Sequence, residues 1–266
     1  MQYLETLVNS VKRIAVLAGK VIMEVYQDEA SFGITHKKDD SPLTVADQRA
    51  NRLICDELVK ISPEIPIISE ENKAIPYEER KTFEYAWLVD PVDGTKEFIK
   101  RNGEFTVNIA LIHHGKIVLG VVYVPVSKEL FWATKGSGAF RQVQESDEAV
   151  NVLTAPRFTM KDKGLKVVCS RSHLNEGTAN FIAQLNQPEK VSKGSSLKFL
   201  ILAQGQAHLY PRLAPTMEWD TGAAHIILEE AGGKVISEDT VKPLYYNKEN
   251  LLNPYFIAYG NVQEVG

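Results

Sequence analysis

The sequence predicts a mixed protein, with an α+β part followed by an α/β part. Apolar side chains recur at helical spacing over residues 3–26 and again over residues 43–61, which indicates two amphipathic helices. Short apolar, strand-like runs come next, and beyond the polar stretch 142–147 strands and helices alternate. We therefore expect an N-terminal domain over 1–147 and a C-terminal domain over 148–266.

The sequence pattern of the first part predicts helices and a sheet. Short strands at 65–68 and 85–89 end in carboxylates, at Ser69-Glu70-Glu71 and at Asp90. A hairpin over residues 105–124 is expected to close at His114-Gly115, and residues 132–140 continue the sheet through a Gly-Ser-Gly turn.

The second part alternates between the two kinds of element. Helix 221–231 is expected to stop at Gly232-Gly233, because glycine commonly ends a helix. The other expected elements are strands at 165–169, 207–210, 234–237 and 255–259 and helices at 176–185 and 197–203.

The composition excludes several classes of protein. The 266 residues are 44% hydrophobic and 24% charged with a net charge of −4, and no long basic block favours binding to a nucleic-acid polymer. No apolar run is long enough to span a membrane, and the N-terminal stretch is typical of an amphipathic helix and not of a signal peptide. Cys55 and Cys169 lie in apolar runs, so we expect buried, reduced thiols and a cytoplasmic protein.

The strongest chemical signal is the run Trp-Leu-Val-Asp-Pro-Val-Asp-Gly-Thr at residues 87–95. A strand delivers Asp90, a turn brings Asp93, and the Val92 carbonyl lies between them. Carboxylate and carbonyl oxygens are the ligands that Mg²⁺ prefers. Gly94 then allows close approach of the backbone to a ligand, and Thr95 supplies a hydroxyl group at the start of a helix whose amides could hold phosphate. The alternative is a simple Asp-Pro turn.

Two further acids could join these aspartates. Glu70 follows an apolar strand, and it would lie at the same sheet edge as Asp90 if the two strands are parallel neighbours. Asp220 opens a helix that is rich in small residues. The alternatives are a solvated loop for Glu70 and a helix N-cap for Asp220.

These motifs resemble the inositol monophosphatase superfamily of Mg²⁺-dependent, lithium-sensitive phosphatases, over almost the whole chain. The segments that carry the resemblance are 90–95, 219–224 and 229–233. Residues 96–110 and 194–199 resemble its CysQ branch, the bacterial 3′(2′),5′-bisphosphate nucleotidases. The resemblance implies a layered α-β-α-β-α sandwich of α+β and α/β character. It also implies that metal-activated water converts adenosine 3′,5′-bisphosphate (PAP) to AMP and phosphate in sulfur assimilation, with the phosphosulfate nucleotide as a second candidate substrate.

The resemblance also assigns roles to residues. Two or three Mg²⁺ ions would be held by Glu70, Asp90, Val92, Asp93 and Asp220. Glu70 and Thr95 would position and activate the attacking water, and Asp47 would hydrogen-bond Thr95. A capping box at residues 44–47 is the alternative for Asp47.

Substrate recognition rests on the same resemblance. A planar guanidinium just after a strand end, as expected for Arg212, suits bidentate binding of phosphate, although an isolated cation usually decorates a surface. The full set of expected substrate-binding residues is Asp93, Gly94, Thr95, Lys96, His173, Ser195, Lys198, Arg212 and Asp220.

Other functions remain to be separated from this one. An inositol monophosphatase or a fructose-1,6-bisphosphatase would use the same scaffold and metal ligands. A binding protein without catalysis is disfavoured because all the expected catalytic positions are present. A haloacid-dehalogenase-type phosphatase is disfavoured because its Asp-x-Asp spacing is replaced here by Asp-x-x-Asp. Peripheral attachment to the inner membrane and the oligomeric state stay open.

Overall fold

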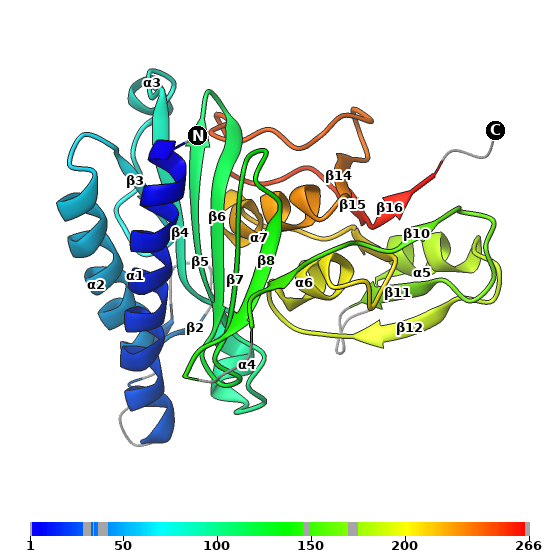
Figure 1. Cartoon of the computed structure of the whole chain (residues 1–266), viewed down its shortest axis with the longest axis horizontal. Coiled ribbons are helices and arrows are strands. Elements are labelled where there is room, and N and C mark those ends of the chain that lie inside the picture. The colour runs from blue at the N-terminus through cyan, green and yellow to red at the C-terminus, as the bar shows by residue number, and fades with distance from the viewer. Residues whose placement is uncertain are drawn as a thin grey trace.

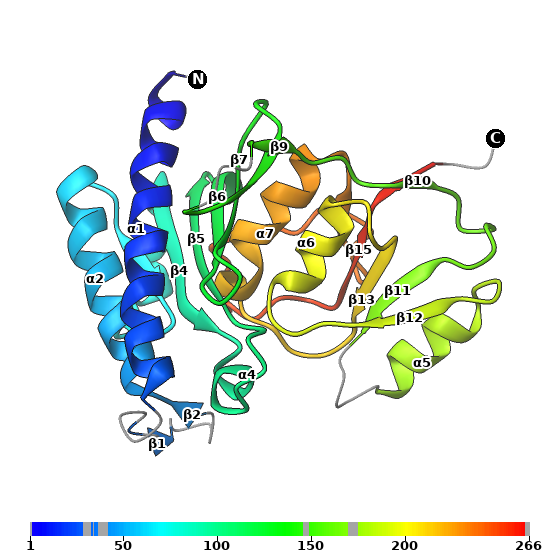
Figure 2. The same cartoon turned by 60° about the horizontal axis from the view of Figure 1, so that its bottom comes forward.

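The structure, a computed structural model, describes residues 2–28, 33, 35–36, 42–145, 149–169 and 175–263. Two large sheets alternate with layers of helices (Figure 1). From left to right in that view lie α1 and α2, a seven-stranded sheet, α7 and α6, a five-stranded sheet, and α5, and the turned view in Figure 2 keeps the same order. The predicted α-β-α-β-α sandwich is therefore confirmed.

The first helical layer consists of α1 (Gln2–Gln27) and α2 (Val45–Ile61), as the periodicity predicts. Most of their apolar side chains are buried, with Ile14 and Ile54 among the least exposed. They share one hydrophobic core with Trp87 of the adjacent sheet, so burial of one helix face holds this layer in place.

The seven-stranded sheet follows the order of the sequence. Its first two strands are parallel and the others antiparallel, and the expected hairpin closes at His114-Gly115. The strands are β3 (Ile67–Ser69), β4 (Tyr85–Asp93), β5 (Thr106–His113), β6 (Lys116–Val124), β7 (Glu129–Thr134), β8 (Ala139–Val143) and β9 (Asn151–Val152). The strand predicted to end before Asp90 thus continues to Asp93.

The five-stranded sheet is mixed, with β11 parallel to β12 and β13, and β15 antiparallel to β13 and β14. Its order is β12-β11-β13-β15-β14. The strands are β11 (Lys166–Cys169), β12 (Glu189–Ser192), β13 (Leu209–Arg212), β14 (Lys234–Ser237) and β15 (Phe256–Tyr259). The sequence suggested that Arg212 follows the end of a strand. In the structure it is the last residue of β13.

Helices cover both faces of this sheet. They are α5 (Glu176–Ala183), α6 (Leu197–Ala203) and α7 (Glu218–Glu230). The prediction placed the start of α7 at residue 221, three residues too late. The helix begins earlier because the Asp220 carboxylate accepts a hydrogen bond from the Met217 backbone N–H (2.9 Å) and so caps the first turn. Asp220 therefore lies inside the helix and is not the N-cap residue.

The short elements connect these layers. They are β1 (Thr35–His36), β2 (Pro42–Leu43), α3 (Tyr77–Arg80), α4 (Thr95–Ile99), β10 (Arg157–Phe158) and β16 (Asn261–Val262). The predicted domain boundary at residue 147 lies outside the described residues, and β9 beyond it still pairs with the first sheet, so the division into domains stays a prediction.

Helix α7 approaches the first sheet closely. A Cβ atom added to Gly120 of β6 would lie 2.4 Å from the Ala223 carbonyl oxygen, and one added to Gly222 would lie 3.2 Å from Leu88 and from Ile117. The small residues predicted at the start of this helix therefore allow backbone and sheet to touch.

Both thiols are free, with Cys169 buried as expected and Cys55 only half-buried. Over the part of the chain that the structure describes, no helix has the length and apolar character of a membrane span.

Candidate active site

Three carboxylates from distant parts of the chain meet at one edge of the first sheet. Strands β3 and β4 are parallel, with Ser69 paired to Val89, so Glu70 and Asp90 leave the paired segments side by side as predicted. The Glu70 backbone N–H donates to the Val89 carbonyl oxygen (3.1 Å). Asp220 arrives on the first turn of α7, and one oxygen from each of the three carboxylates lies within 4.8 Å of the others.

Asp93 joins this group through an irregularity in β4. Side chains three residues apart in a regular strand point to opposite faces of a sheet. The pairing with β5 shifts register between Asp90 and Asp93, which lets the second aspartate turn toward the first. Its charge raises the pKa of both Asp90 and Asp220.

The clustered negative charges of the site favour the binding of cations. Burial, followed by the charges of Glu70, Asp93 and Asp220, raises the pKa of Asp90 well above its usual range. Burial and the charge of Asp93 raise the pKa of Asp220 to about 8. Carboxylates so close together, with Asp90 buried and Glu70 and Asp220 partly exposed, are protonated or neutralised by bound cations. Because the donors are all oxygen atoms, they fit a hard divalent cation such as Mg²⁺.

Thr95 links the acidic group to the second helix. Its hydroxyl lies 3.2 Å from the Asp47 carboxylate and 3.2 Å from the Val92 carbonyl oxygen. The other carboxylate oxygen of Asp47 accepts from the Thr44 backbone N–H (2.8 Å). Both contacts expected of Asp47 are therefore present, since one oxygen caps α2 and the other faces Thr95.

A network that the sequence did not reveal holds Asp93 in place. One of its carboxylate oxygens accepts from the Ser195 hydroxyl (2.6 Å), the Ser196 backbone N–H (2.7 Å) and the Asn108 amide (3.4 Å). The Thr106 hydroxyl contacts Ser195 (2.8 Å) and donates to Asn108 (2.9 Å). The signal available in the sequence was the pair of polar residues, Thr106 and Asn108, at alternate positions of the largely apolar strand β5.

A hollow of about 80 Å³ adjoins the carboxylates. Lys198 is buried there and donates to the Ser195 carbonyl oxygen (2.9 Å), while Arg212 donates to the Pro215 carbonyl oxygen (2.7 Å). The buried Nε of Arg212 has no hydrogen-bond partner among the described residues. The residues that line the hollow are Asp93, Ser195, Ser196, Lys198, Phe199, Tyr210, Arg212, Thr216, Asp220 and Thr221.

Some predicted residues stand apart from this hollow. Lys96 is exposed in the first turn of α4, and His173 lies outside the described residues. Gly94 adopts a left-handed conformation (φ 94°), in which an added Cβ would lie 3.1 Å from the Glu104 carbonyl oxygen.

A larger hollow of about 690 Å³ is lined by residues 63–66, 79 and 82–85, but Glu70, Asp90 and Asp220 do not line it. We therefore identify the candidate site by its converging carboxylates and not by the size of the hollow.

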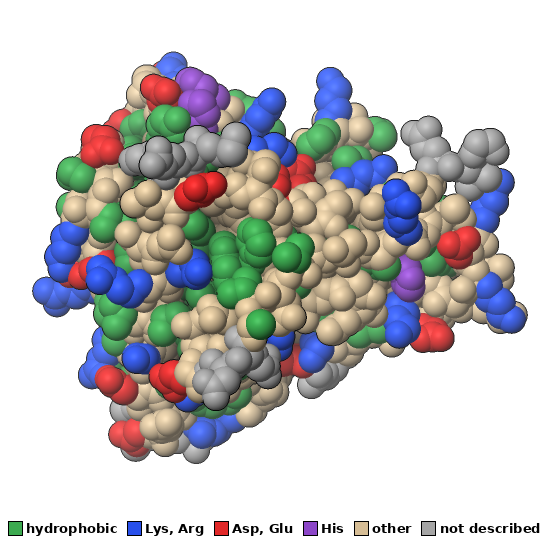
Figure 3. All heavy atoms as spheres, in the orientation of Figure 1, with side chains coloured by type: hydrophobic (Ala, Val, Ile, Leu, Met, Phe, Trp, Pro, Cys, Tyr) green, Lys and Arg blue, Asp and Glu red, His purple; other side chains and the backbone are tan. Residues whose placement is uncertain are grey.

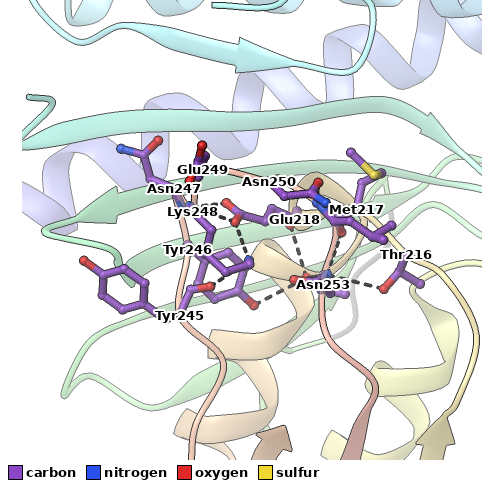
Figure 4. Close-up of polar contacts among 12 residues, drawn as sticks. Thr216, Met217, Glu218, Tyr245, Tyr246, Asn247, Lys248, Glu249, Asn250 and Asn253 are labelled. Carbon is purple, nitrogen blue, oxygen red and sulfur yellow. Dashed lines mark hydrogen bonds and ion pairs between the residues drawn. The ribbon is translucent and has the colours of Figure 1, made fainter. Parts of the chain in front are cut away.

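An ion pair between the buried Glu218 and the partly exposed Lys248 fixes the start of α7 and with it Asp220. Glu218 is completely buried, accepts from the backbone N–H groups of Asn247 (2.5 Å) and Lys248 (3.1 Å), and pairs with the Lys248 ammonium. Asn253 donates to the Met217 carbonyl oxygen (2.8 Å). Figure 4 shows these contacts tying the loop 245–253 to the first turn of the helix.

The chain also matches known proteins along its length. Residues 4–258 match the model of the inositol monophosphatase family. The chain belongs to this family. It is 43% identical to 3′(2′),5′-bisphosphate nucleotidase CysQ of Salmonella typhimurium, over 94% of this chain and 98% of that protein. The CysQ protein of Haemophilus influenzae is 33% identical, over 97% and 94% of the two chains.

Solved structures of the inositol monophosphatase family share the fold. CysQ from Bacteroides thetaiotaomicron superposes with a TM-score of 0.84 at 41% identity, covering 98% of this chain and 99% of that one. An inositol monophosphatase from Anabaena gives a TM-score of 0.73 at 25% identity, covering 98% and 93%. The acidic group is thus a candidate metal centre in a member of a metal-dependent family.

Proposed function

We propose that this chain is a Mg²⁺-dependent 3′(2′),5′-bisphosphate nucleotidase that converts PAP to AMP and phosphate. The observation that carries the proposal is the convergence of Glu70, Asp90 and Asp220 beside a hollow that also holds Lys198 and Arg212. The names of the CysQ relatives support the same substrate class.

Two or three Mg²⁺ ions are proposed to bind at the acidic group. The protein ligands would be carboxylate oxygens of Glu70, Asp90, Asp93 and Asp220 together with the Val92 carbonyl oxygen, which retains a free lone pair beside its contact with Thr95. When bound, the ions would neutralise the charge on phosphate and make water more acidic. The free oxygen of Asp93 remains available because the other one accepts the three contacts from Ser195, Ser196 and Asn108.

The chain's own groups would orient the attacking water. A hydroxyl group has one proton to donate and two lone pairs. If Thr95 donates its proton to Asp47, its lone pairs remain to accept a hydrogen bond from the water. The Glu70 carboxylate would then receive the proton that the water loses as it attacks phosphorus. Asp47 would act by fixing the direction of the Thr95 hydroxyl, so it is a positioning residue.

The hollow next to the metal centre would hold the second phosphate. At about 80 Å³ it is small beside the roughly 300–1,000 Å³ that encloses a whole drug-sized ligand, so it suits one group of the substrate. The unpaired Arg212 Nε and the Lys198 ammonium are the cations that could bind it. Ser195 and His173 would complete the contacts, and the Gly94, Thr95 and Lys96 segment would face the phosphate that is cleaved.

Phosphate release from a panel of substrates tests the proposal. PAP should be cleaved best, and adenosine 3′-phosphate 5′-phosphosulfate, 3′-AMP, inositol 1-phosphate and fructose 1,6-bisphosphate should follow. Chelation should abolish release and Mg²⁺ should restore it, whereas lithium should inhibit. A preference for inositol 1-phosphate would move the chain to the alternative function on the same scaffold, and full activity in chelator would refute the metal mechanism.

We also propose a cytoplasmic location, which the two free thiols support. Cell fractionation tests this, because recovery of the protein in the membrane pellet would favour peripheral attachment instead.

A further inference from the structure

Three side chains with metal-binding atoms meet at the other end of the first sheet. Glu84 precedes β4, His113 ends β5, and His114 begins the turn to β6. The Glu84 carboxylate lies 3.4 Å from Nε2 of His113 and 4.0 Å from Nε2 of His114. One ligand atom from each of the three residues lies within 4.8 Å of the others. Figure 3 shows histidine side chains beside acidic ones at the upper edge of the molecule.

The backbone holds this group in a fixed arrangement. His114 and Gly115 both adopt left-handed conformations (φ 46° and 72°), which suits a tight two-residue hairpin turn. The His114 N–H donates to the Glu84 carbonyl oxygen (2.9 Å), and the Tyr246 N–H donates to that of Gly115 (2.9 Å). Hydrogen bonds therefore join the turn to the segment before β4 on one side and to the loop 245–253 on the other.

An aromatic contact orients one of the imidazoles. The ring of Tyr85 stacks on the ring of His113, with centroids 4.3 Å apart and planes 15° from parallel. Since the two residues are paired across β4 and β5, the ladder itself sets this contact. In this stacked position, Nε2 of His113 lies 3.4 Å from the Glu84 carboxylate.

We propose that Glu84, His113 and His114 form a site for a divalent transition metal, with Zn²⁺ as the ion that fits best. Two imidazoles and a carboxylate are a common ligand set for zinc, whereas Mg²⁺ prefers oxygen atoms alone. Bond lengths near 2.0–2.2 Å place tetrahedral ligand atoms about 3.4 Å apart. The Glu84–His113 separation already has this value, and the 4.0 Å between Glu84 and the exposed His114 would need only a rotation of the His114 side chain to reach it. A water molecule would complete the coordination.

The proposed site is distinct from the carboxylate centre in both place and chemistry. Tyr85 pairs with His113 at one end of the β4–β5 ladder, and Asp93 pairs with Thr106 at the other. Eight residues of extended strand separate these ends, a distance of about 26 Å. An ion bound at the turn would join the segment before β4 to the hairpin without touching the substrate.

Calorimetric titration of untagged protein with Zn²⁺, in saturating Mg²⁺ to fill the carboxylate centre, tests the proposal. We expect one equivalent of Zn²⁺ to bind, with the affinity reduced about tenfold or more by His113→Gln or His114→Gln. The matched control is His208→Gln, which changes a half-buried histidine directly before β13 of the five-stranded sheet. It should leave the affinity for Zn²⁺ unchanged. Mg²⁺-dependent phosphate release should be the same in all of these variants.

Electron paramagnetic resonance with Cu²⁺ in place of Zn²⁺ gives an independent signature. Nitrogen hyperfine coupling should appear in the wild type and disappear in the His113→Gln/His114→Gln double variant, because the carboxylate centre offers only oxygen ligands. Zn²⁺ binding of equal affinity and stoichiometry in the double variant would overturn the proposal. So would the absence of a Zn²⁺ equivalent in the wild type.

Discussion

Replacing Glu218 by alanine should destabilise the protein and weaken its metal centre together. The carboxylate is completely buried and accepts hydrogen bonds from two backbone N–H groups, those of Asn247 and Lys248. Alanine leaves both donors without a partner, at about 1–3 kcal/mol each. The Lys248 ammonium loses less, because it still donates to the Tyr245 carbonyl oxygen (3.0 Å) and is partly exposed.

The expected cost follows from these contacts. Water can enter the space that the side chain leaves and hydrate the two donors. We therefore expect the free energy of unfolding to fall by about 3 kcal/mol, in the lower half of the summed range. At about 2–4 °C per kcal/mol for a chain of this size, Tm should fall by about 6–12 °C. Because Asp220 lies in the same helical turn, the Mg²⁺ concentration for half-maximal activity should also rise several-fold.

Differential scanning calorimetry and Mg²⁺ titration of phosphate release measure the two effects. Glu249→Ala removes an exposed carboxylate from the same loop and is the matched control, with an expected change in Tm of no more than about 2 °C. If Glu218→Ala melts within 2 °C of that control, the buried Glu218 carboxylate does not fix the start of α7, and the reasoning is wrong.

Three further predictions concern the catalytic site. Thr95→Ala should lower kcat more than it raises KM in steady-state assays, because the hydroxyl orients the water; an equal change in both would point to substrate binding instead. Arg212→Ala and Lys198→Ala should each lower kcat/KM for PAP by about one to two decades, from the loss of about 1.5–3 kcal/mol. Cleavage of 3′-AMP should change much less, and equal losses on both substrates would place the second phosphate elsewhere. In chelator, Tm should fall as pH rises from about 5 to 8, because burial raises the pKa of Asp220 from 3.8 to about 8 and the folded state then binds more protons than the unfolded state. Asp220→Asn should flatten that dependence, and a metal-free Tm that is independent of pH would contradict it.

The elements predicted correctly are those with a strong local signal. Helix α1, helix α2 and the hairpin at His114-Gly115 follow from periodicity and turn residues that lie within a few positions of each other. The meeting of Glu70 with Asp90 also followed, because two apolar strands that each end in an acid are readily placed side by side.

The features that escaped prediction depend on contacts between distant segments. Asn108 and Ser196 hold Asp93, but a polar residue in an apolar strand does not reveal which neighbour it will meet. Glu218 caps a loop about thirty residues further along the chain, so its role appears only once the chain is folded. Likewise, Lys198 and Arg212 could be placed beside the acids only by family resemblance, and two-residue strands such as β10 are too short to show a pattern.

The contact between Gly120 and Ala223 has a consequence for the evolution of this enzyme. A methyl group at residue 120 would need the helix to withdraw by roughly 1 Å, since its carbon would otherwise lie 2.4 Å from the Ala223 carbonyl oxygen. Asp220 sits one turn earlier on that helix, whereas Asp90 belongs to β4 and Glu70 directly follows β3, so the withdrawal would widen the gap between the ligands. Mg²⁺ requires ligand distances near 2.1 Å and tolerates little departure from them. A substitution at position 120, in the middle of the sheet, would therefore change the spacing of the proposed metal ligands and weaken metal binding while the fold persists.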